Sequence, residues 1–145
     1  MSKIKVVYWS STGNTEAMAE AIARGIESAG GEAQLLEADN VSASDFSDDQ
    51  VFALGCPAMG AEELEDSVVE PLVADLEGSV SGKKIALFGS YDWGDGEWMR
   101  IWAERMEKAG AQIVGGEGLI CNNTPDEDGI AACEKLGVKL TEAYR

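Results

Sequence analysis

The part of this sequence best suited to chemistry is a six-residue string of hydroxyls, one amide and one glycine that follows a strand-like run over residues 4–9. The string consists of Ser10, Ser11, Thr12, Gly13, Asn14 and Thr15. A helical pattern begins directly after it, and the first turn of a helix has unpaired N–H groups and a partial positive charge that stabilise an anion. Hydroxyl and amide side chains can add hydrogen bonds to the same oxygens. The string therefore predicts a phosphate site built from neutral donors.

A serine-rich turn that only caps a helix would also explain this string, because short capping strings are common. Two better-known nucleotide loops are excluded. The chain has no G-x-x-x-x-G-K-[S/T] string, so the lysine of a triphosphate site is missing, and its nearest approach to G-x-G-x-x-G, which begins at Gly94, ends on Met99. Since no lysine or arginine lies within the string, the remaining hypothesis is a loop for a monophosphate.

Two further loops contain groups suited to a flat heteroaromatic ring, and each follows a predicted strand. The second loop offers Pro57, Ala58, Met59, Gly60, Ala61 and Glu62. The third loop offers Ser90, Tyr91, Asp92, Trp93, Gly94 and Asp95. A ring stacked on Trp93 could rest on Met59 with its other face, while Glu62 accepts a hydrogen bond from a ring N–H. Taken singly, these residues are better explained as core filler, a hydrophobic plug or a solvated charge; their joint placement favours a ring site.

Alternating strand and helix patterns position these loops. Strands are predicted over residues 4–9, 33–36, 51–55, 85–89 and, interrupted by two glycines, 112–121. Capping-box spacing of Ser67 with Glu70, and of Thr124 with Glu127, marks two of the helix starts. Five strands alternating with five helices predict an α/β fold, a doubly wound parallel sheet with helices on both faces. Its ligand would lie at the carboxyl ends of the strands.

Length and composition narrow the class of protein. The 145 residues are expected to form one domain over residues 1–145. No apolar run approaches the ~18 residues of a membrane helix, and the first strand follows Met1 too closely to leave room for a signal peptide. Three cysteines without a C-x-x-C pair, and no histidine, argue against a disulfide framework, a zinc site and histidine-based catalysis. We therefore expect a cytoplasmic protein without membrane association.

The net charge of −16, from 11 basic and 27 acidic residues, points to the kind of partner. Such a surface repels nucleic acid and anionic membranes, and favours docking to basic patches on another protein. Simple solubility, or adaptation to a salty cytoplasm, would also explain it. The placement of the acidic residues favours the first explanation, because Glu62, Glu63, Glu65 and Asp66 gather in the second loop and Asp92, Asp95 and Glu97 in the third.

At these three loops the sequence resembles the flavodoxins, specifically the short-chain type of anaerobic bacteria. The resemblance extends from end to end, and it is strongest over residues 7–16, 54–60 and 82–96. Residues 112–121 leave no room for the long insertion that splits the fifth strand of long-chain flavodoxins. The resemblance implies a flavodoxin-like five-stranded sheet of order 2-1-3-4-5 with FMN at the point where the strand order reverses.

The resemblance also implies a role for each loop. Residues Ser10 to Thr15 would hold the FMN phosphate. Met59 to Glu62 would line the inner face and the pyrimidine edge of the flavin, with Glu62 accepting from N3–H. Trp93 would stack on the outer face, the backbone of residues 91–94 would bond the pyrimidine oxygens, and Asn123 would touch the ribityl chain.

Two positions depart from the pattern of the family. Ala61 occupies a place where an acidic or hydroxylated residue is frequent, and Asp92 one where glycine is frequent. The first change alters the energetics of the turn in the second loop. The second adds a negative charge near the flavin.

The function implied is that of a monomeric, low-potential one-electron carrier that shuttles FMN between semiquinone and hydroquinone, without substrate turnover of its own. Carboxylates around the flavin, with no cation nearby, disfavour the added negative charge of the hydroquinone. The Gly60 carbonyl could turn toward flavin N5–H, a backbone change that glycine tolerates. Partners would be redox proteins with basic docking patches.

Three alternatives on related folds are weaker. An FMN-dependent quinone or azo reductase would need a substrate pocket over the ring, which Trp93 would cover. A cysteine phosphatase would have arginine six residues after Cys56, where this chain has Glu62. A receiver domain would need an acidic pocket where the hydroxyl-rich first loop lies.

Overall fold

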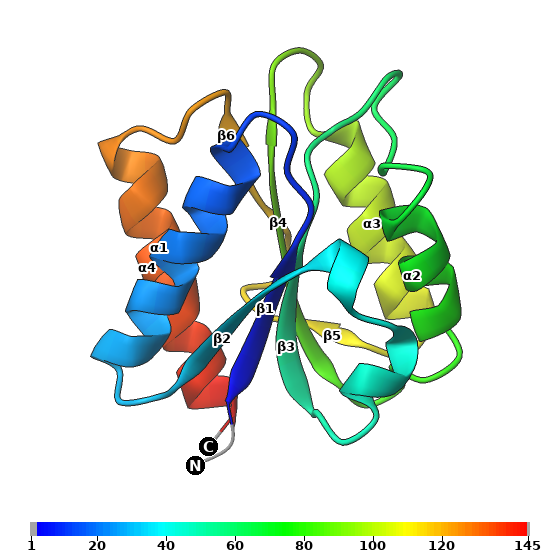
Figure 1. Cartoon of the computed structure of the whole chain (residues 1–145), viewed down its shortest axis with the longest axis vertical. Coiled ribbons are helices and arrows are strands. Elements are labelled where there is room, and N and C mark those ends of the chain that lie inside the picture. Colours follow the sequence, from blue (N-terminus) through cyan, green and yellow to red (C-terminus); the bar gives the residue numbers. More distant parts are fainter. Residues whose placement is uncertain (1–2, 145) are drawn as a thin grey trace.

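A computed structural model describes residues 3–144 and shows a parallel sheet whose strands follow the order β2-β1-β3-β4-β5, with β6 also paired to β4 (Figure 1). The strands are β1 Ile4–Tyr8, β2 Ala33–Glu37, β3 Val51–Gly55, β4 Lys84–Tyr91, β5 Gln112–Ile113 and β6 Leu119–Asn122. The predicted fold class and strand order are confirmed. The fifth strand consists of two segments along β4, and Gly115 and Gly116, with φ of 87° and 88°, form the break between them.

Helices cover both faces of this sheet, as expected for a parallel sheet (Figure 1). They are α1 Asn14–Ser28, α2 Val69–Leu76, α3 Glu97–Lys108 and α4 Glu127–Tyr144. Helices α1 and α4 lie on one face, and α2 and α3 lie on the other (Figure 1). Each pair of helices packs against one face of the sheet through a separate hydrophobic core, so β1 and β3 are covered on both faces.

The prediction of five α-helices is wrong for the described residues, which form four. Between β2 and β3 the chain makes two short 3-10 turns, Ala38–Asn40 and Ala43–Phe46. This stretch is rich in serine and aspartate, whose side chains compete with helical hydrogen bonds, and it has few apolar residues at helical spacing. Phe46 alone of the second turn is buried in the core.

The start of α2 differs from the predicted capping box. The Glu65 carboxylate, rather than Ser67 and Glu70, satisfies the first N–H groups of α2. Its Oε1 accepts from the N–H of Val68 at 2.7 Å and of Val69 at 3.0 Å, and its Oε2 accepts from the N–H of Ser67 at 2.9 Å and from the Ser67 hydroxyl.

The start of α4 is also displaced from the prediction. Asp126, rather than Thr124, caps it, since Asp126 Oδ1 accepts from Gly129 N–H at 2.8 Å. The Thr124 hydroxyl donates instead to Asn14 Oδ1 at 3.1 Å, and so joins the start of α1 to the loop before α4. At both helix starts the acceptor is therefore a carboxylate, whose negative charge is stabilised by the positive end of the helix dipole.

Within the described part of the chain, no helix combines the length and apolar character needed to cross a membrane.

Candidate functional site

The three loops singled out in the sequence meet at the carboxyl ends of β1, β3 and β4, where they enclose a cavity of about 310 Å³. These are the loops at the upper edge of the sheet in Figure 1. The cavity is lined by Ser11, Thr12, Asn14, Pro57, Ala58, Met59, Gly60, Ser90, Tyr91, Asp92, Trp93 and Asn123. The expectation that the loops share one crevice is thereby confirmed. Of the predicted site residues, Ser10, Gly13, Thr15, Ala61, Glu62, Gly94 and Asp95 do not line this cavity.

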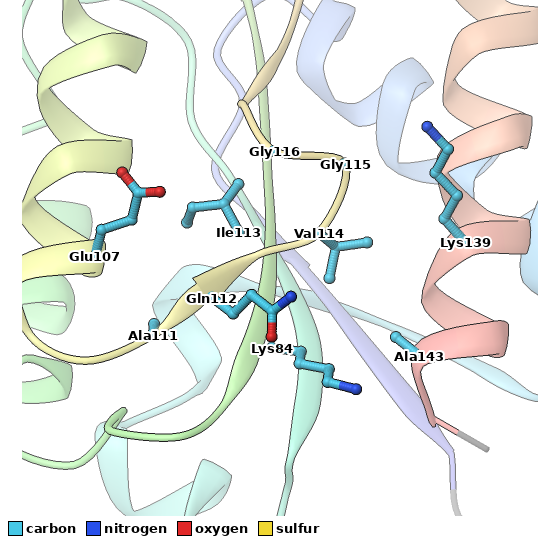
Figure 2. A pocket seen from close by; sticks show the side chains of 10 residues that line it. All are labelled: Lys84, Glu107, Ala111, Gln112, Ile113, Val114, Gly115, Gly116, Lys139 and Ala143. Carbon is cyan, nitrogen blue, oxygen red and sulfur yellow. The ribbon is translucent and has the colours of Figure 1, made fainter.

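A larger cavity, of about 630 Å³, lies at the opposite end of β4, beside β5 and the last turns of α3 and α4 (Figure 2). It contains none of the predicted site residues. The side chains of Lys84, Glu107 and Lys139 project from its wall in different directions and do not converge on one point (Figure 2). The smaller cavity, where polar and aromatic groups converge from three loops, is therefore the candidate functional site.

Three of the four hydroxyls in the first loop make hydrogen bonds that hold the loop in shape, including Thr12 Oγ1, which accepts from the N–H of Asn14 at 3.4 Å. Ser10 Oγ accepts from the N–H of Gly13 at 3.1 Å and of Glu16 at 3.4 Å. The Thr15 hydroxyl is buried and pairs with the Ser90 hydroxyl at 3.0 Å, which ties the start of α1 to the end of β4. Gly13, the N-cap of α1, has φ of 94°, a conformation that favours glycine.

Ser11, Thr12 and Asn14 of the first loop line the cavity, and several donors of the loop are unused. Among the described residues, no acceptor pairs with the backbone N–H groups of Ser11, Thr12 or Thr15. Asn14 Oδ1 already accepts from Thr124, so the donor end of that amide remains available. Among residues 3–144, no lysine or arginine lines the cavity. This set of neutral donors is of the kind that can hold a phosphate, so the phosphate site stays a prediction.

The second loop is a tight hairpin closed by two backbone hydrogen bonds of 2.8 Å between Met59 and Glu63. Gly60 and Glu62 both have left-handed backbones, with φ of 50° and 57°. A Cβ on Gly60 would meet nothing within 4 Å, so the constraint there is conformational rather than steric. This hairpin brings the Met59 side chain and the Gly60 backbone to the cavity.

The Glu62 side chain reaches the third loop. Its Oε1 accepts from the backbone N–H of Asp95 at 3.2 Å and of Gly96 at 3.1 Å. The sequence suggested an acceptor for a ring N–H or a solvated acidic charge at this position. It did not suggest this contact, because no local pattern shows that two loops 33 residues apart will touch.

The third loop presents its aromatic side chain to solvent. Trp93 is 59% exposed, although its side chain also lines the cavity. The Tyr91 and Trp98 rings lie 5.7 Å apart, and Trp98 Nε1 donates to the Cys56 carbonyl at 3.1 Å. Asn123, with φ of 55°, donates its N–H to the Tyr91 carbonyl at 2.6 Å. The third loop thus offers an exposed ring that a second flat ring can cover.

Two features of the site bear on its chemistry. Burial raises the pKa of the Cys56 thiol to about 12, so this cysteine is not a thiolate nucleophile. Arg100 pairs with Asp95 at 3.0 Å, and both side chains are exposed. This pair partly neutralises the acidic third loop, but neither residue lines the cavity.

Known proteins match this chain along nearly all of its length. The family model for flavodoxin matches residues 6–137. The flavodoxin of Megasphaera elsdenii is 46% identical over 140 residues, covering 97% of this chain and 99% of the relative. That of Clostridium beijerinckii is 48% identical over 137 residues, covering 94% of this chain and 98% of the relative.

Solved structures agree. The solution structure of two-electron reduced Megasphaera elsdenii flavodoxin has a TM-score of 0.87 at 45% identity, covering 96% of this chain and 98% of the other. Oxidised flavodoxin 2 from Bacillus cereus has a TM-score of 0.85 at 31% identity, covering 99% of this chain and 100% of the other. The family model, the close relatives and the order of the strands all agree, and this chain belongs to the flavodoxin family.

Proposed function

We propose that this flavodoxin holds its FMN in the cavity of about 310 Å³ between the first, second and third loops, and that its acidic surface directs it to basic redox partners. As a member of the family, the chain is an FMN-dependent electron-transfer protein and not an enzyme with its own substrate. A quinone or azo reductase is not favoured, because the close relatives are flavodoxins. The convergence of neutral donors with an exposed aromatic side chain in one cavity is the observation that carries the proposal.

The first loop would bind the FMN phosphate. The free N–H groups of Ser11, Thr12 and Thr15 lie at the positive end of α1, and the side chains of Ser11, Thr12 and Asn14 line the cavity beside them. Ser10 and Thr15 would act by holding the loop in this shape, through the hydrogen bonds that they already make.

The second and third loops would bind the isoalloxazine ring. Met59 and Trp93 offer a polarizable thioether and a flat ring for its two faces. Pro57, Ala58 and Gly60 would line the inner side, and the backbone of residues 90–94 the pyrimidine side. Asn123 would meet the ribityl chain.

Bound FMN supplies one-electron redox chemistry, and the chain tunes it. Asp92 lines the cavity with a carboxylate for which the described residues provide no ion-pair partner. A negative charge beside the ring disfavours further negative charge on it, which lowers the potential. Arg100 partly offsets the charge of Asp95, so Asp92 contributes the less compensated charge.

The surface of the protein fits a monomer that docks transiently to a partner protein. In the described chain the large exposed apolar side chains are Leu35, Trp93 and Ile101, which lie on separate elements and fit a monomer. The exposed Trp93 beside Asp92 marks the face where a basic partner would approach. Three free, buried cysteines fit a reducing compartment such as the cytoplasm.

Titration of the FMN-free protein with FMN and with riboflavin, which lacks the phosphate, tests the site. Thr12→Ala removes one cavity-facing donor, so the affinity for FMN should fall about five- to tenfold while that for riboflavin stays near the parent value. Riboflavin itself should bind far more weakly than FMN. Equal losses for both ligands would show that the first loop is not the phosphate site.

A further inference from the structure

Glu62 differs from the other carboxylates around the cavity because both its backbone and its side chain are constrained. Its φ of 57° lies in the left-handed region, which residues with a Cβ rarely adopt. Its half-buried carboxylate accepts two backbone hydrogen bonds on one oxygen, from Asp95 at 3.2 Å and Gly96 at 3.1 Å. The strained backbone of the second loop thus aims this side chain at the third loop.

The N–H groups that it meets belong to the start of α3. The N-cap of α3 is Gly96, with φ of 93°, and a glycine has no side chain to cap a helix. Glu62 Oε1 therefore fixes Asp95 and the N-cap residue Gly96, which directly precede the first turn of α3, and its negative charge is favourable near the positive end of that helix.

The neighbouring Gly94 leaves room for this contact. A Cβ on Gly94 would lie 2.3 Å from Glu62 Oε1, closer than atoms can approach, and φ of 89° at Gly94 also favours glycine. Any side chain at position 94 would therefore push the Glu62 carboxylate off the two N–H groups.

We propose that Glu62 is a positioning residue that clamps the loop bearing Trp93 to the second loop. One oxygen, Oε1, fixes the turn at residues 94–96, and the other, Oε2, accepts no hydrogen bond within residues 3–144 and is left for a flavin N–H. This inference rests on the proposed function. Its consequence is that half of the ring site is organised before FMN binds, so that Glu62 contributes to flavin affinity through the loop as well as through a direct bond.

Amide hydrogen exchange of Asp95 and Gly96 in the FMN-free protein, measured by NMR, tests the clamp without any flavin. Glu62→Gly removes the carboxylate without adding backbone strain, and exchange at both amides should accelerate about tenfold or more. Glu62→Gln keeps an acceptor oxygen, so exchange should stay near the parent rate. Unchanged exchange in Glu62→Gly would overturn the proposal.

Displacement of the carboxylate provides a second route to the same result. Gly94→Ala should accelerate exchange at Asp95 and Gly96 although Glu62 is intact. Gly116→Ala is the matched control, because its φ of 88° imposes the same strain and a Cβ there meets nothing within 4 Å. If Gly94→Ala leaves the two amides as protected as Gly116→Ala does, the clamp is wrong.

Flavin binding then separates this inference from the proposed function. The Asp95 and Gly96 amides should remain protected when FMN is bound; loss of their protection would mean that Glu62 leaves the loop for the ring, which contradicts a simultaneous role. Glu62→Gly and Gly94→Ala should weaken the binding of FMN and of riboflavin by similar factors, whereas Thr12→Ala should weaken the binding of FMN alone. If amide exchange at Asp95 and Gly96 accelerates in both variants but the parent protein binds no flavin, the clamp is supported and the proposed function is refuted.

Discussion

Trp98 and Trp102 of α3 are buried to nearly the same degree, 2% and 1% exposed, but differ in one hydrogen bond. Trp98 Nε1 donates to the Cys56 carbonyl, at the base of the second loop. Trp102 Nε1 has no partner among the described residues, although burial removes it from water. An unpaired buried donor reduces the stability that the rest of its side chain provides.

Replacing each tryptophan by phenylalanine should expose this difference. Both changes remove similar volume, but Trp98→Phe also leaves the Cys56 carbonyl without its donor, whereas Trp102→Phe removes an unsatisfied N–H. Trp98→Phe should therefore cost about 1–2 kcal/mol more of the unfolding free energy than Trp102→Phe. Urea unfolding of the FMN-free variants measures this difference. Equal losses would show that the Trp98 hydrogen bond adds no net stability.

At the scale of elements, the start of α2 depends on one carboxylate. Burial alone would raise the pKa of Glu65, but hydrogen bonds from the Ser67 hydroxyl and from the N–H groups of Val69, Ser67 and Val68 outweigh it and hold the pKa below its ordinary value of 4.5. Because the folded pKa is depressed, the ionised group contributes stability above the unfolded pKa. That contribution is lost as the pH falls through the lower folded value.

Glu65→Gln should therefore lower stability at pH 7 by about 1 kcal/mol and flatten the loss of stability below about pH 4.5. Thermal unfolding as a function of pH measures both effects. Glu63→Gln, an exposed neighbour that caps no helix, should leave the profile as in the parent chain. A Glu65→Gln curve parallel to that of the parent from pH 3 to pH 7 would contradict the assignment.

The same helix start shows where sequence reasoning succeeds and where it fails. Apolar periodicity predicted the strands and helices, because it reflects which residues of one element are buried. The alternation of strands and helices then predicted a parallel sheet with its ligand-binding loops at the carboxyl ends of the strands. The caps of α2 and α4 were misplaced, since several adjacent side chains are equally able to cap and only packing selects Glu65 and Asp126.

Contacts between distant loops were also beyond prediction. The hydroxyl string predicted a phosphate loop. The hydrogen bonds of Thr15 to Ser90 and of Glu62 to Asp95 join residues 75 and 33 positions apart, and no local pattern pointed to them. Their side chains have the same types whether they face a ligand or another loop. The fold decides between these roles.

At the scale of the whole molecule, the net charge of −16 raises the question of whether total or local charge sets the potential of bound FMN. Asp92 lies in the cavity wall, whereas Asp48 is exposed just before β3, at the other end of the sheet. Water and salt largely screen the interaction between exposed charges that are more than about 10 Å apart. Distant carboxylates should therefore contribute little to the potential of the flavin.

Asp92→Asn should therefore raise the midpoint potential of bound FMN by about 10–40 mV, while Asp48→Asn, which removes the same charge, should change it by much less. Arg100→Gln should shift the potential in the opposite direction, because it frees the charge of Asp95. Spectroscopic redox titration at low and high ionic strength measures all three, and each shift should shrink as salt is added. Equal shifts for Asp92→Asn and Asp48→Asn would mean that the potential follows the net charge of the molecule. In that case the third loop would have no special part in tuning the flavin.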